Sequence, residues 1–226
     1  MPYAVLNPCG LRCVPCGGGR RKAMIAIVDY GAGNLRSVAN ALSRVGCAPK
    51  VTSEPREVLE AGAVVFPGVG AAPVAMRNLE RKGLGDAVRR LIEEDRPLFA
   101  VCIGMQVLFS VTEEGGGHEC LGVLSGQVRR LPSGLVVPHM GWNQVRQQVV
   151  HPVFEGVPDG ADFYFVHSFC CYPEDDSVVA GTTEYGVRFC SMAIRGNLIA
   201  TQFHPEKSGE HGLRLYSNFL GMAGVR

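Results

Sequence analysis

Short apolar runs alternate with amphipathic segments through the first half of the chain. Runs of strand length cover residues 24–31, 49–52, 63–68 and 97–101. The segments between them repeat apolar residues every three to four positions, which is the spacing of a helix face. They predict helices over residues 34–46, 55–60 and 73–94, the last broken near Gly83 and Gly85. Strands that alternate with helices in this way predict a parallel sheet covered on both faces.

The pattern changes after Gly115. Short runs of strand-forming residues are separated there by turn residues, and we expect several of these strands to be antiparallel. They cover residues 122–130, 135–137, 143–150, 162–169, 178–184, 187–194 and 198–202. A last helix is predicted over residues 208–220. The sequence therefore predicts an α/β fold with a mixed, mainly parallel central sheet flanked by helices, and with antiparallel strands in the C-terminal half.

The composition limits the classes of partner. The 22 basic and 21 acidic residues almost cancel, and no basic stripe stands out, so we expect no nucleic-acid partner. No apolar run is long enough to cross a bilayer, so we expect no membrane partner. The nine cysteines are odd in number, show no pairing pattern and follow no secretory signal. We therefore expect a cytoplasmic protein with free thiols, most of them small buried apolar side chains.

The first 23 residues differ in composition and pattern from the rest. They are rich in Pro, Gly and Arg and show no periodicity. Cys9, Cys13 and Cys16 have C-x3-C-x2-C spacing, which could hold a metal or an iron–sulfur cluster. A radical enzyme with this spacing needs a large barrel after it, and the sequence predicts none. We therefore interpret residues 1–23 as a disordered extension, followed by one domain over residues 24–226, and we expect no metal and no cofactor.

Cys102 lies where a predicted strand meets a predicted helix. The apolar run 97–101 leads into it, Gly104 follows, and the apolar residues 105–109 are expected to continue as a helix. A strand, a sharp turn and a helix raise the central side chain above the end of a sheet. The helix N-terminus would face the sulfur, and its partial positive charge favours a thiolate. Cys102 is therefore a candidate nucleophile; a buried structural cysteine is the alternative.

His204 and Glu206 follow another predicted strand near the end of the chain. Alternation places both side chains on the same side of the backbone, which Pro205 stiffens between them. The carboxylate can then orient the imidazole and stabilise its protonated form, as in other catalytic triads. On its own, this pattern also fits a solvent-facing turn. Together with Cys102 it supplies the parts of covalent acyl-transfer catalysis.

Glycine-rich turns follow two of the predicted strands. The turn PGVG at residues 67–70 is expected to open at the same sheet edge as Cys102 and to stabilise an oxyanion; an ordinary loop is the alternative. The candidate donors are the backbone N–H groups of Gly68, Val69, Gly70 and Ile103. The turn GAGN at residues 31–34 lacks the further glycine and the acidic residue of a nucleotide-binding motif. We interpret it as a tight turn into a helix, with Asn34 as the N-cap.

Two other stretches cannot be assigned from periodicity. Trp142, the only Trp, lies in the turn-like run PHMGWN at residues 138–143. An exposed Trp would indicate a partner surface, whereas a buried one belongs to the core. His167, in the run FYFVHSF at residues 163–169, could act as a second general base, but a structural role fits it better.

These motifs together resemble the class I glutamine amidotransferases. The supporting runs span almost everything from Met24 to the C-terminus. They are DYGAGNL (29–35), FPGVGA (66–71), CIGMQ (102–106), PHMGWN (138–143), YFVHS (164–168) and QFHPEKSG (202–209). CIGMQ and FHPE are shared by the whole class, whereas PHMGWN and YFVHS are typical of the glutaminase subunits of imidazole glycerol phosphate synthase. The elbow of the family usually has Gly where this chain has Ala100, and residues 1–23 have no counterpart in the resemblance.

The resemblance implies a flavodoxin-like fold of the class I amidotransferase type and hydrolysis of glutamine. Cys102 would attack the carboxamide, His204 would protonate the departing ammonia, and water would release glutamate from a glutamyl thioester. The substrate-binding residues carried over from the family are Gln106, Glu114, His167 and Ser168. The residues carried over to the interface with a partner subunit are Asn34, Trp142, Tyr164 and Lys207.

The implied partner is a cyclase subunit with a (β/α)8 barrel, which would form a heterodimer with this chain. The cyclase uses ammonia to make imidazole glycerol phosphate and an aminoimidazole carboxamide ribonucleotide in histidine biosynthesis. A competing hypothesis is the glutaminase of a different ammonia-channelling synthase, such as that of pyridoxal phosphate, anthranilate or GMP synthesis. A catalytically inactive binding subunit and an oxidation-sensing cysteine protein also compete, although an oxidation sensor needs no His-Pro-Glu motif.

Overall fold

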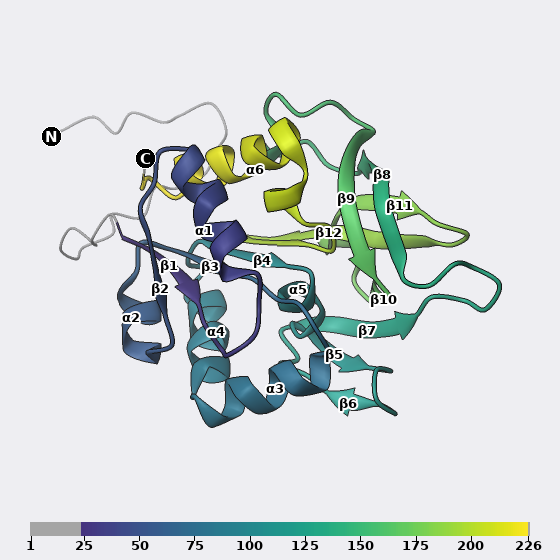
Figure 1. Cartoon of the computed structure of the whole chain (residues 1–226), viewed down its shortest axis with the longest axis horizontal. Coiled ribbons are helices and arrows are strands. Elements are labelled where there is room, and N and C mark those ends of the chain that lie inside the picture. Colours follow the sequence, from purple (N-terminus) through teal and green to yellow (C-terminus); the bar gives the residue numbers. More distant parts are fainter. Residues whose placement is uncertain (1–23, 226) are drawn as a thin grey trace, which may run out of the picture.

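Parallel strands form the centre of the computed structural model, which describes residues 24–225. They are β1 (Ile25–Val28), β2 (Pro49–Thr52), β3 (Ala63–Phe66), β4 (Leu98–Val101) and β13 (Leu198–Thr201). Their order in the sheet is β2, β1, β3, β4, β13 (Figure 1). Every residue of β1, β3, β4 and β13 is buried, because helices cover both faces. This is the flavodoxin-like strand order, in which ligands bind beyond the carboxyl ends of the strands.

Amphipathic helices cover the two faces of this parallel block. Helices α1 (Leu35–Arg44) and α6 (Gly209–Met222) lie together on one face (Figure 1). The other face carries α2 (Pro55–Glu60), α3 (Ala72–Arg81) and α4 (Leu84–Glu93). The ring of Phe99 on β4 has its centroid 5.1 Å from that of Tyr216 and 5.4 Å from that of Phe219, so aromatic contacts fix α6 over the sheet. Within residues 24–225, no helix is both long and apolar enough to cross a membrane.

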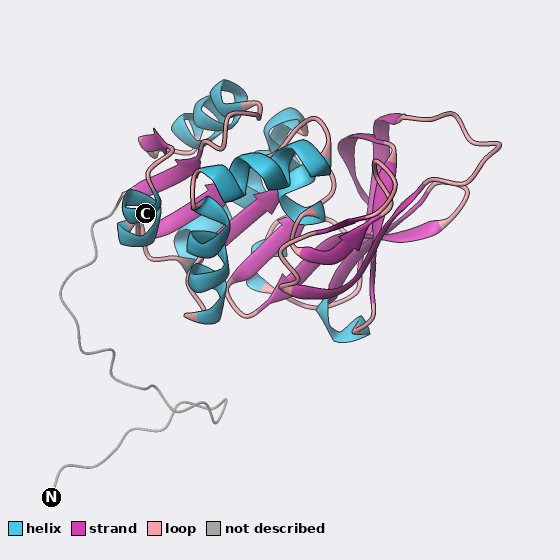
Figure 2. Ribbon diagram, turned by 90° about the horizontal axis from the view of Figure 1, so that it is seen from below, coloured by secondary structure: helices cyan, strands magenta, loops and turns pink. Residues whose placement is uncertain are grey.

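Antiparallel strands extend the sheet beyond β13 (Figure 2). They are β5 (Phe109–Thr112), β6 (His118–Glu119), β7 (Leu124–Arg130), β8 (His139–Gln147), β9 (Ala161–His167), β10 (Phe169–Pro173), β11 (Val179–Glu184) and β12 (Arg188–Arg195). β12 pairs with β13, β10 and β11, and β8 pairs with both β9 and β11. β5 and β7 are an exception in this region, because they run parallel. The predicted α/β class, mixed and mainly parallel at its centre, is confirmed.

The segment after Cys102 differs from the prediction. Helix α5 (Ile103–Gln106) is a single turn, and the run predicted as helix at residues 105–109 leaves it to enter β5. A continuous apolar run is compatible with either a buried helix or a buried strand, so periodicity could not place this boundary. The macrodipole of so short a helix is small, and the unpaired N–H groups of its first turn provide the local positive charge instead.

Two further predictions for the C-terminal half were wrong. Residues 135–137 form no strand, and residues 138–143, predicted as a turn, are mostly part of β8. In β8 the inward positions include His139 and Asn143, whereas the outward positions include the exposed Met140 and Trp142. This inverted polarity hides the alternation that identifies a half-buried strand. Short 3₁₀ turns lie at Pro152–Phe154, Asp176–Val178 and Pro205–Lys207.

Candidate active site

Cys102 occupies a strained corner at the carboxyl end of β4. Its backbone has φ +53° and ψ −108°, in the left-handed half of conformational space that a residue with a side chain rarely adopts. The N–H of Cys102 donates to Thr201 O at 2.7 Å, which ties the corner to β13. Such strain costs about 1–3 kcal/mol and is commonly found at functional sites. Ala100, where Gly is usual in the family, is fully buried within β4 and has no positive φ, so its methyl group is accommodated.

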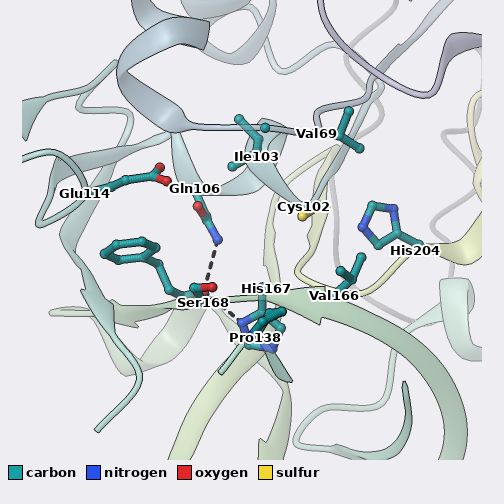
Figure 3. Close-up of a pocket in the computed structure, with 12 residues that line it drawn as sticks. Val69, Cys102, Ile103, Gln106, Glu114, Pro138, Val166, His167, Ser168 and His204 are labelled. Atoms are coloured by element: carbon teal, nitrogen blue, oxygen red, sulfur yellow. Dashed lines mark hydrogen bonds between the residues drawn. The ribbon is translucent and has the colours of Figure 1, made fainter. Parts of the chain in front are cut away.

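Two glycines bring the turn at residues 67–70 against this corner. A Cβ atom on Gly104 would lie 2.2 Å from Phe66 O, and one on Gly68 would lie 2.6 Å from Gly104 N. Neither position can hold a side chain unless the backbone moves. Val69 and Ile103 line a cavity in front of Cys102 (Figure 3), together with Gly70, whereas Gly68 packs against Ile103 and Gly104. The turn therefore lies where N–H groups can reach a reacting oxygen above the sulfur.

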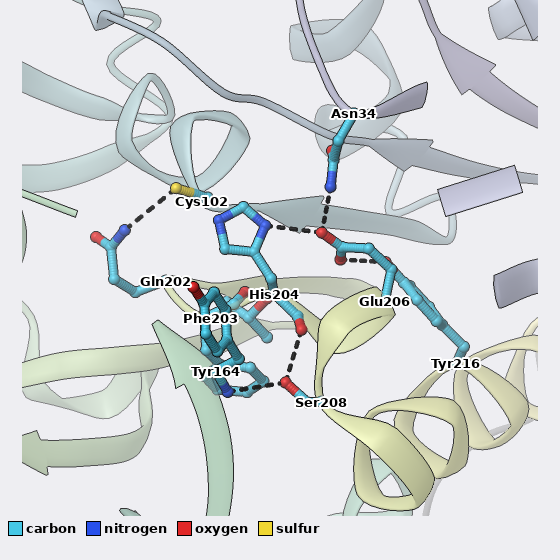
Figure 4. A network of polar contacts seen from close by, with 10 residues as sticks. Asn34, Cys102, Tyr164, Gln202, Phe203, His204, Glu206, Ser208 and Tyr216 are labelled. Atoms are coloured by element: carbon cyan, nitrogen blue, oxygen red, sulfur yellow. Dashed lines mark hydrogen bonds and ion pairs between the residues drawn. The ribbon is translucent and has the colours of Figure 1, made fainter. Parts of the chain in front are cut away.

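His204 and Glu206 lie together beside Cys102. His204 Nδ1 is 2.7 Å from Glu206 Oε1, and both side chains are fully buried. The other ring nitrogen of His204 faces the Cys102 sulfur (Figure 4). Backbone contacts hold the histidine in place, because its N–H donates to Tyr164 O at 2.9 Å and Ser208 Oγ donates to its carbonyl at 2.6 Å. The structure thus joins residues that are far apart in the sequence into one row.

The charges in this row favour a protonated His204. Burial alone lowers the pKa of His204, but the adjacent Cys102 sulfur and the hydrogen-bonded Glu206 carboxylate outweigh burial and raise that pKa to about 10. The imidazole is then charged at neutral pH. A charged imidazolium next to the sulfur stabilises a thiolate and has a proton to give to a leaving group.

Two polar residues that sequence reasoning did not assign to the triad hold Glu206. Asn34 Nδ2 donates to Glu206 Oε1, the same oxygen that contacts His204, and Tyr216 Oη donates to Oε2 at 3.5 Å (Figure 4). Asn34 precedes α1 as predicted, but its side chain makes no capping hydrogen bond. Burial first, and then the Glu206 carboxylate, raises the pKa of Tyr216. These contacts hold the carboxylate against His204.

The cavity in front of Cys102 has a volume of about 240 Å³, which suits a small polar molecule. Gln106, Glu114, His167 and Ser168, the substrate-binding candidates, all line it (Figure 3). Gln106 Nε2 donates to Phe169 O at 3.0 Å, and its Oε1 has no hydrogen-bond partner within residues 24–225. Glu114 Oε2 accepts from Ala72 N at 2.7 Å. The buried, unpaired Oε1 therefore leaves an acceptor for a bound ligand.

His167 is held in a neutral hydrogen-bonded chain. Its Nδ1 donates to Phe169 O at 2.8 Å, so its Nε2 must accept the proton of His139 Nδ1 at 2.9 Å. Asn143 Nδ2, 3.3 Å from His139 Nε2, completes the chain. Burial lowers the pKa of both histidines to about 4. Because both nitrogens of His167 are engaged, the structural interpretation of this residue holds, and a role as general base does not.

A known protein family matches almost the whole of the described chain. The model for glutamine amidotransferase class-I matches residues 26–222. The chain belongs to the class I glutamine amidotransferase family. Among solved structures, this amidotransferase is similar to one described as a glutamine amidotransferase, with a TM-score of 0.68 and 24% identity over 88% of this chain and 98% of the other. PurLQS from Thermotoga maritima gives a TM-score of 0.70 at 18% identity over the same shares. At such identities these structures support the fold alone.

Curated relatives are much more similar in sequence. The imidazole glycerol phosphate synthase subunit HisH of Dehalococcoides mccartyi (strain CBDB1) is 58% identical over 88% of this amidotransferase and 98% of its own length. The subunit HisH of Moorella thermoacetica is 52% identical over 86% of this chain and 93% of its own. The match therefore extends over nearly the full length of both relatives.

An exposed cluster of side chains lies beside His204 of this amidotransferase. Trp142 is 58% exposed and faces Tyr164 across the β8–β9 pair, with ring centroids 6.1 Å apart. Lys207 Nζ lies 5.7 Å from the centre of the Tyr164 ring. Three of the predicted interface residues therefore form one surface, which we call the Trp142 cluster (Trp142, Tyr164 and Lys207), whereas the side chain of Asn34 contacts Glu206 instead.

Metal ligands are not grouped in the part of the amidotransferase that the structure describes. No cluster of three or more His, Cys, Asp or Glu side chains within residues 24–225 could hold a metal ion. Cys9, Cys13 and Cys16, the candidates for a cluster, lie outside the described residues. The cysteines from Cys47 to Cys190 are all free.

Proposed function

We propose that this chain is the glutaminase subunit of an imidazole glycerol phosphate synthase and that it hydrolyses glutamine through a thioester on Cys102. The observation on which the proposal rests is the buried row of Cys102, His204 and Glu206 at the edge of a ligand-sized cavity. The names of the relatives, at 58% and 52% identity over nearly their full length, favour this synthase over other amidotransferases.

The first half of the reaction forms the thioester. The Cys102 thiolate attacks the carboxamide carbon of glutamine, and the electrons of the C=O bond move to the oxygen. Val69, Gly70 and Ile103 line the cavity, and their backbone N–H groups are proposed to hold this oxyanion. As the intermediate collapses, the C–N bond breaks and His204 gives its proton to the nitrogen, which leaves as ammonia. The raised pKa of His204 keeps this proton available at neutral pH.

The second half releases glutamate. Neutral His204 accepts a proton from water, whose oxygen attacks the thioester carbon. The C–S bond then breaks, and the thiolate is restored beside the imidazolium. Glu206 stabilises the charged ring at both stages through the 2.7 Å contact to Nδ1. Gln106, Glu114, His167 and Ser168 are proposed to surround the amino-acid end of glutamine. The free Gln106 oxygen and the Glu114 carboxylate suit its ammonium group, whereas His167, whose ring nitrogens are both engaged, forms part of the cavity wall.

The proposed partner is a cyclase subunit with a (β/α)8 barrel, bound as a heterodimer through the Trp142 cluster and the nearby Asn34. Ammonia reacts through its lone pair, so it must reach the cyclase unprotonated. The Trp142 cluster is a suitable docking surface, because Tyr164 accepts a backbone hydrogen bond from His204 and the cluster therefore borders the site of ammonia release. Exposed aromatic side chains are frequent anchors of protein interfaces.

The proposal extends to the organisation of the chain. Residues 24–226 would form the amidotransferase domain, with residues 1–23 as an extension outside it, in line with the family match at residues 26–222. The cytoplasm is the proposed location, supported by the free thiols of the described cysteines.

Replacement of the nucleophile tests the proposed reaction. Cys102→Ala is expected to lower glutamine-dependent synthesis by the complex by about a thousandfold or more, because removal of a nucleophile removes the covalent route. Ammonia-dependent synthesis should survive, since it needs only the cyclase. Cys47→Ala, a change at a partly buried cysteine outside the cavity, is the matched control and should keep both activities. Glutamine-dependent turnover by the Cys102→Ala complex would show that the nucleophile is another residue.

The proposed partner surface has a test of its own. Trp142→Ala should weaken binding of the purified cyclase by roughly 10- to 100-fold, as loss of an aromatic anchor does. Val150→Ala removes another exposed apolar side chain away from the cluster and should leave binding unchanged. The rate of glutamate release is measured as the cyclase is added. It should be feeble without the cyclase, and for Trp142→Ala it should reach its maximum at a higher cyclase concentration than for the wild type. Full glutaminase activity of the isolated chain would contradict coupling between the subunits.

A further inference from the structure

Gln202 lies in the active site, although the proposed mechanism gives it no role. It directly follows β13, two residues before His204, and its backbone N–H donates to Ser191 O at 2.9 Å. The side chain is fully buried and points toward the Cys102 sulfur, on the other side of the sulfur from the His204 ring (Figure 4). A buried amide this close to a nucleophile needs an explanation, because its polar groups lose their water on folding.

Hydrogen bonds fix which end of the Gln202 amide faces the sulfur. Its Oε1 accepts from Gln106 Nε2 at 3.0 Å and from the Cys171 thiol at 3.9 Å. Both neighbours are donors, so the oxygen must lie toward them. The Nε2 group then points the other way and donates to Cys102 Sγ at 3.6 Å, a normal length for a sulfur acceptor. The orientation of the amide is therefore set by its surroundings.

We propose that Gln202 is a positioning residue for the nucleophile: its N–H group holds the Cys102 sulfur as a thiolate, and its oxygen fixes Gln106 at the wall of the cavity. The inference rests on the proposed function, in which this sulfur attacks glutamine. The sulfur lies between this donor and the His204 ring and lines the cavity in which glutamine would be attacked (Figure 4). As charge moves from sulfur to the substrate oxygen, the amide contact weakens without any proton transfer.

Few titratable groups within residues 24–225 surround this sulfur, so the contribution of Gln202 can be separated from theirs. Those with a direct electrostatic interaction with it are His204 from the segment after β13, Tyr30 from the segment after β1, and Cys171 from β10, whereas Glu114 and His167 line the same cavity. Burial raises the pKa of Tyr30 and of Cys171 above their usual values, so both stay neutral through the neutral range. Among these three, His204 is therefore the charged neighbour, and an uncharged amide adds a second, pH-independent stabilisation of the thiolate.

The test measures the sulfur directly and does not require glutamine turnover. The full chain is treated with iodoacetamide between pH 5 and pH 9, and the rate of modification is followed on the peptide that contains Cys102. Gln202→Met removes the donor at nearly constant size. The midpoint of the pH–rate curve should move upward by about one pH unit, which makes alkylation about tenfold slower below the midpoint and unchanged well above it. Gln147→Met, which removes a glutamine bonded to Val157 O, is the control and should leave the curve unchanged.

Gln202→Glu provides a second variant in case the Met variant does not fold. It keeps the size and the oxygen that Gln106 contacts, but it replaces the N–H by a second oxygen. Its midpoint should rise at least as far as that of Gln202→Met. Glutaminase assays of the complex should show a lowered kcat that recovers at high pH. A pH–rate curve that coincides with the wild type, or a loss confined to KM at every pH, would overturn the proposal while leaving Cys102 as nucleophile.

Discussion

Replacing Glu206 by Gln isolates the role of one charge in the triad. Glu206 Oε1 accepts from both His204 Nδ1 and Asn34 Nδ2, and Oε2 accepts from Tyr216 Oη. In Glu206→Gln the amide oxygen can keep both contacts on its own side. The new NH2 group then faces the Tyr216 hydroxyl, which can accept as well as donate. Because Asn34 Nδ2 is the atom that contacts Oε1, we expect the amide oxygen of the Glu206→Gln variant to stay toward His204, so that the substitution removes the charge without changing the tautomer.

The size of the effect follows from this geometry. A hydrogen bond to a charged group contributes about 1.5–3 kcal/mol and a neutral one about 0.5–1.5 kcal/mol. The imidazolium should therefore lose about 1–2 kcal/mol, and kcat should fall roughly 5- to 30-fold. Triads in which an amide enforces the wrong tautomer lose about 10⁴-fold. Adding Asn34→Leu to Glu206→Gln frees the amide to rotate, so the double variant should lose far more activity than the product of the single effects.

The assay is glutamate release by the complex at saturating glutamine, with urea unfolding as a check on folding. Glu57→Gln is the control, because it neutralises a carboxylate that bridges Lys50 at 2.7 Å on the surface beside β2, and it should leave kcat unchanged. A folded Glu206→Gln complex with wild-type kcat would refute charge stabilisation of His204. A fall in kcat of about 10⁴-fold in the single variant would show that Asn34 does not hold the amide oxygen toward His204.

Two other predictions concern the backbone and pH. Gly104→Ala should abolish glutaminase activity, because its Cβ would lie 2.2 Å from Phe66 O. Gly221→Ala is the control: its Cβ would meet nothing within 4 Å, so it should stabilise the fold by about 0.5–1 kcal/mol in urea unfolding. Burial lowers the pKa of His167 from 6.5 to about 4, so stability is full above pH 6.5 and declines as pH falls toward 4. His167 alone should contribute about 2 kcal/mol to the loss in free energy of unfolding between pH 7 and pH 5. His167→Asn should therefore lower that loss by about this amount, whereas the exposed His118→Asn should leave it unchanged; equal losses in the wild type and His167→Asn would contradict the assignment.

Local rules were sufficient to predict the parallel half and the elbow. Buried runs such as residues 63–66 lie between helices whose apolar spacing is regular, and Gly104 after Cys102 marks a close approach of two backbones. The spacing of His204 and Glu206 likewise placed both side chains in one row. These features depend on neighbours in sequence, which is why the sequence alone could reveal them.

Long-range contacts were beyond such rules. The donation from Asn34 to Glu206 and that from Gln202 to Cys102 each join segments that no periodicity relates. The limits of strand β8 were predicted wrongly because its apolar Trp142 faces outward while its polar His139 faces inward, the reverse of an ordinary half-buried strand. A reversed pattern of this kind is informative in a sequence. An exposed apolar side chain and a buried polar one in the same strand both indicate positions that are not explained by core packing alone.

The central claim is that glutamine is hydrolysed through a covalent intermediate on Cys102. The most direct measurement is mass spectrometry of the complex, acid-quenched during turnover of glutamine, followed by peptide mapping. The account predicts a mass increase of one glutamyl group on the peptide that contains Cys102, and no such increase after Cys102→Ala. A glutamyl group on a different residue, or steady turnover of glutamine by the Cys102→Ala complex, would contradict it.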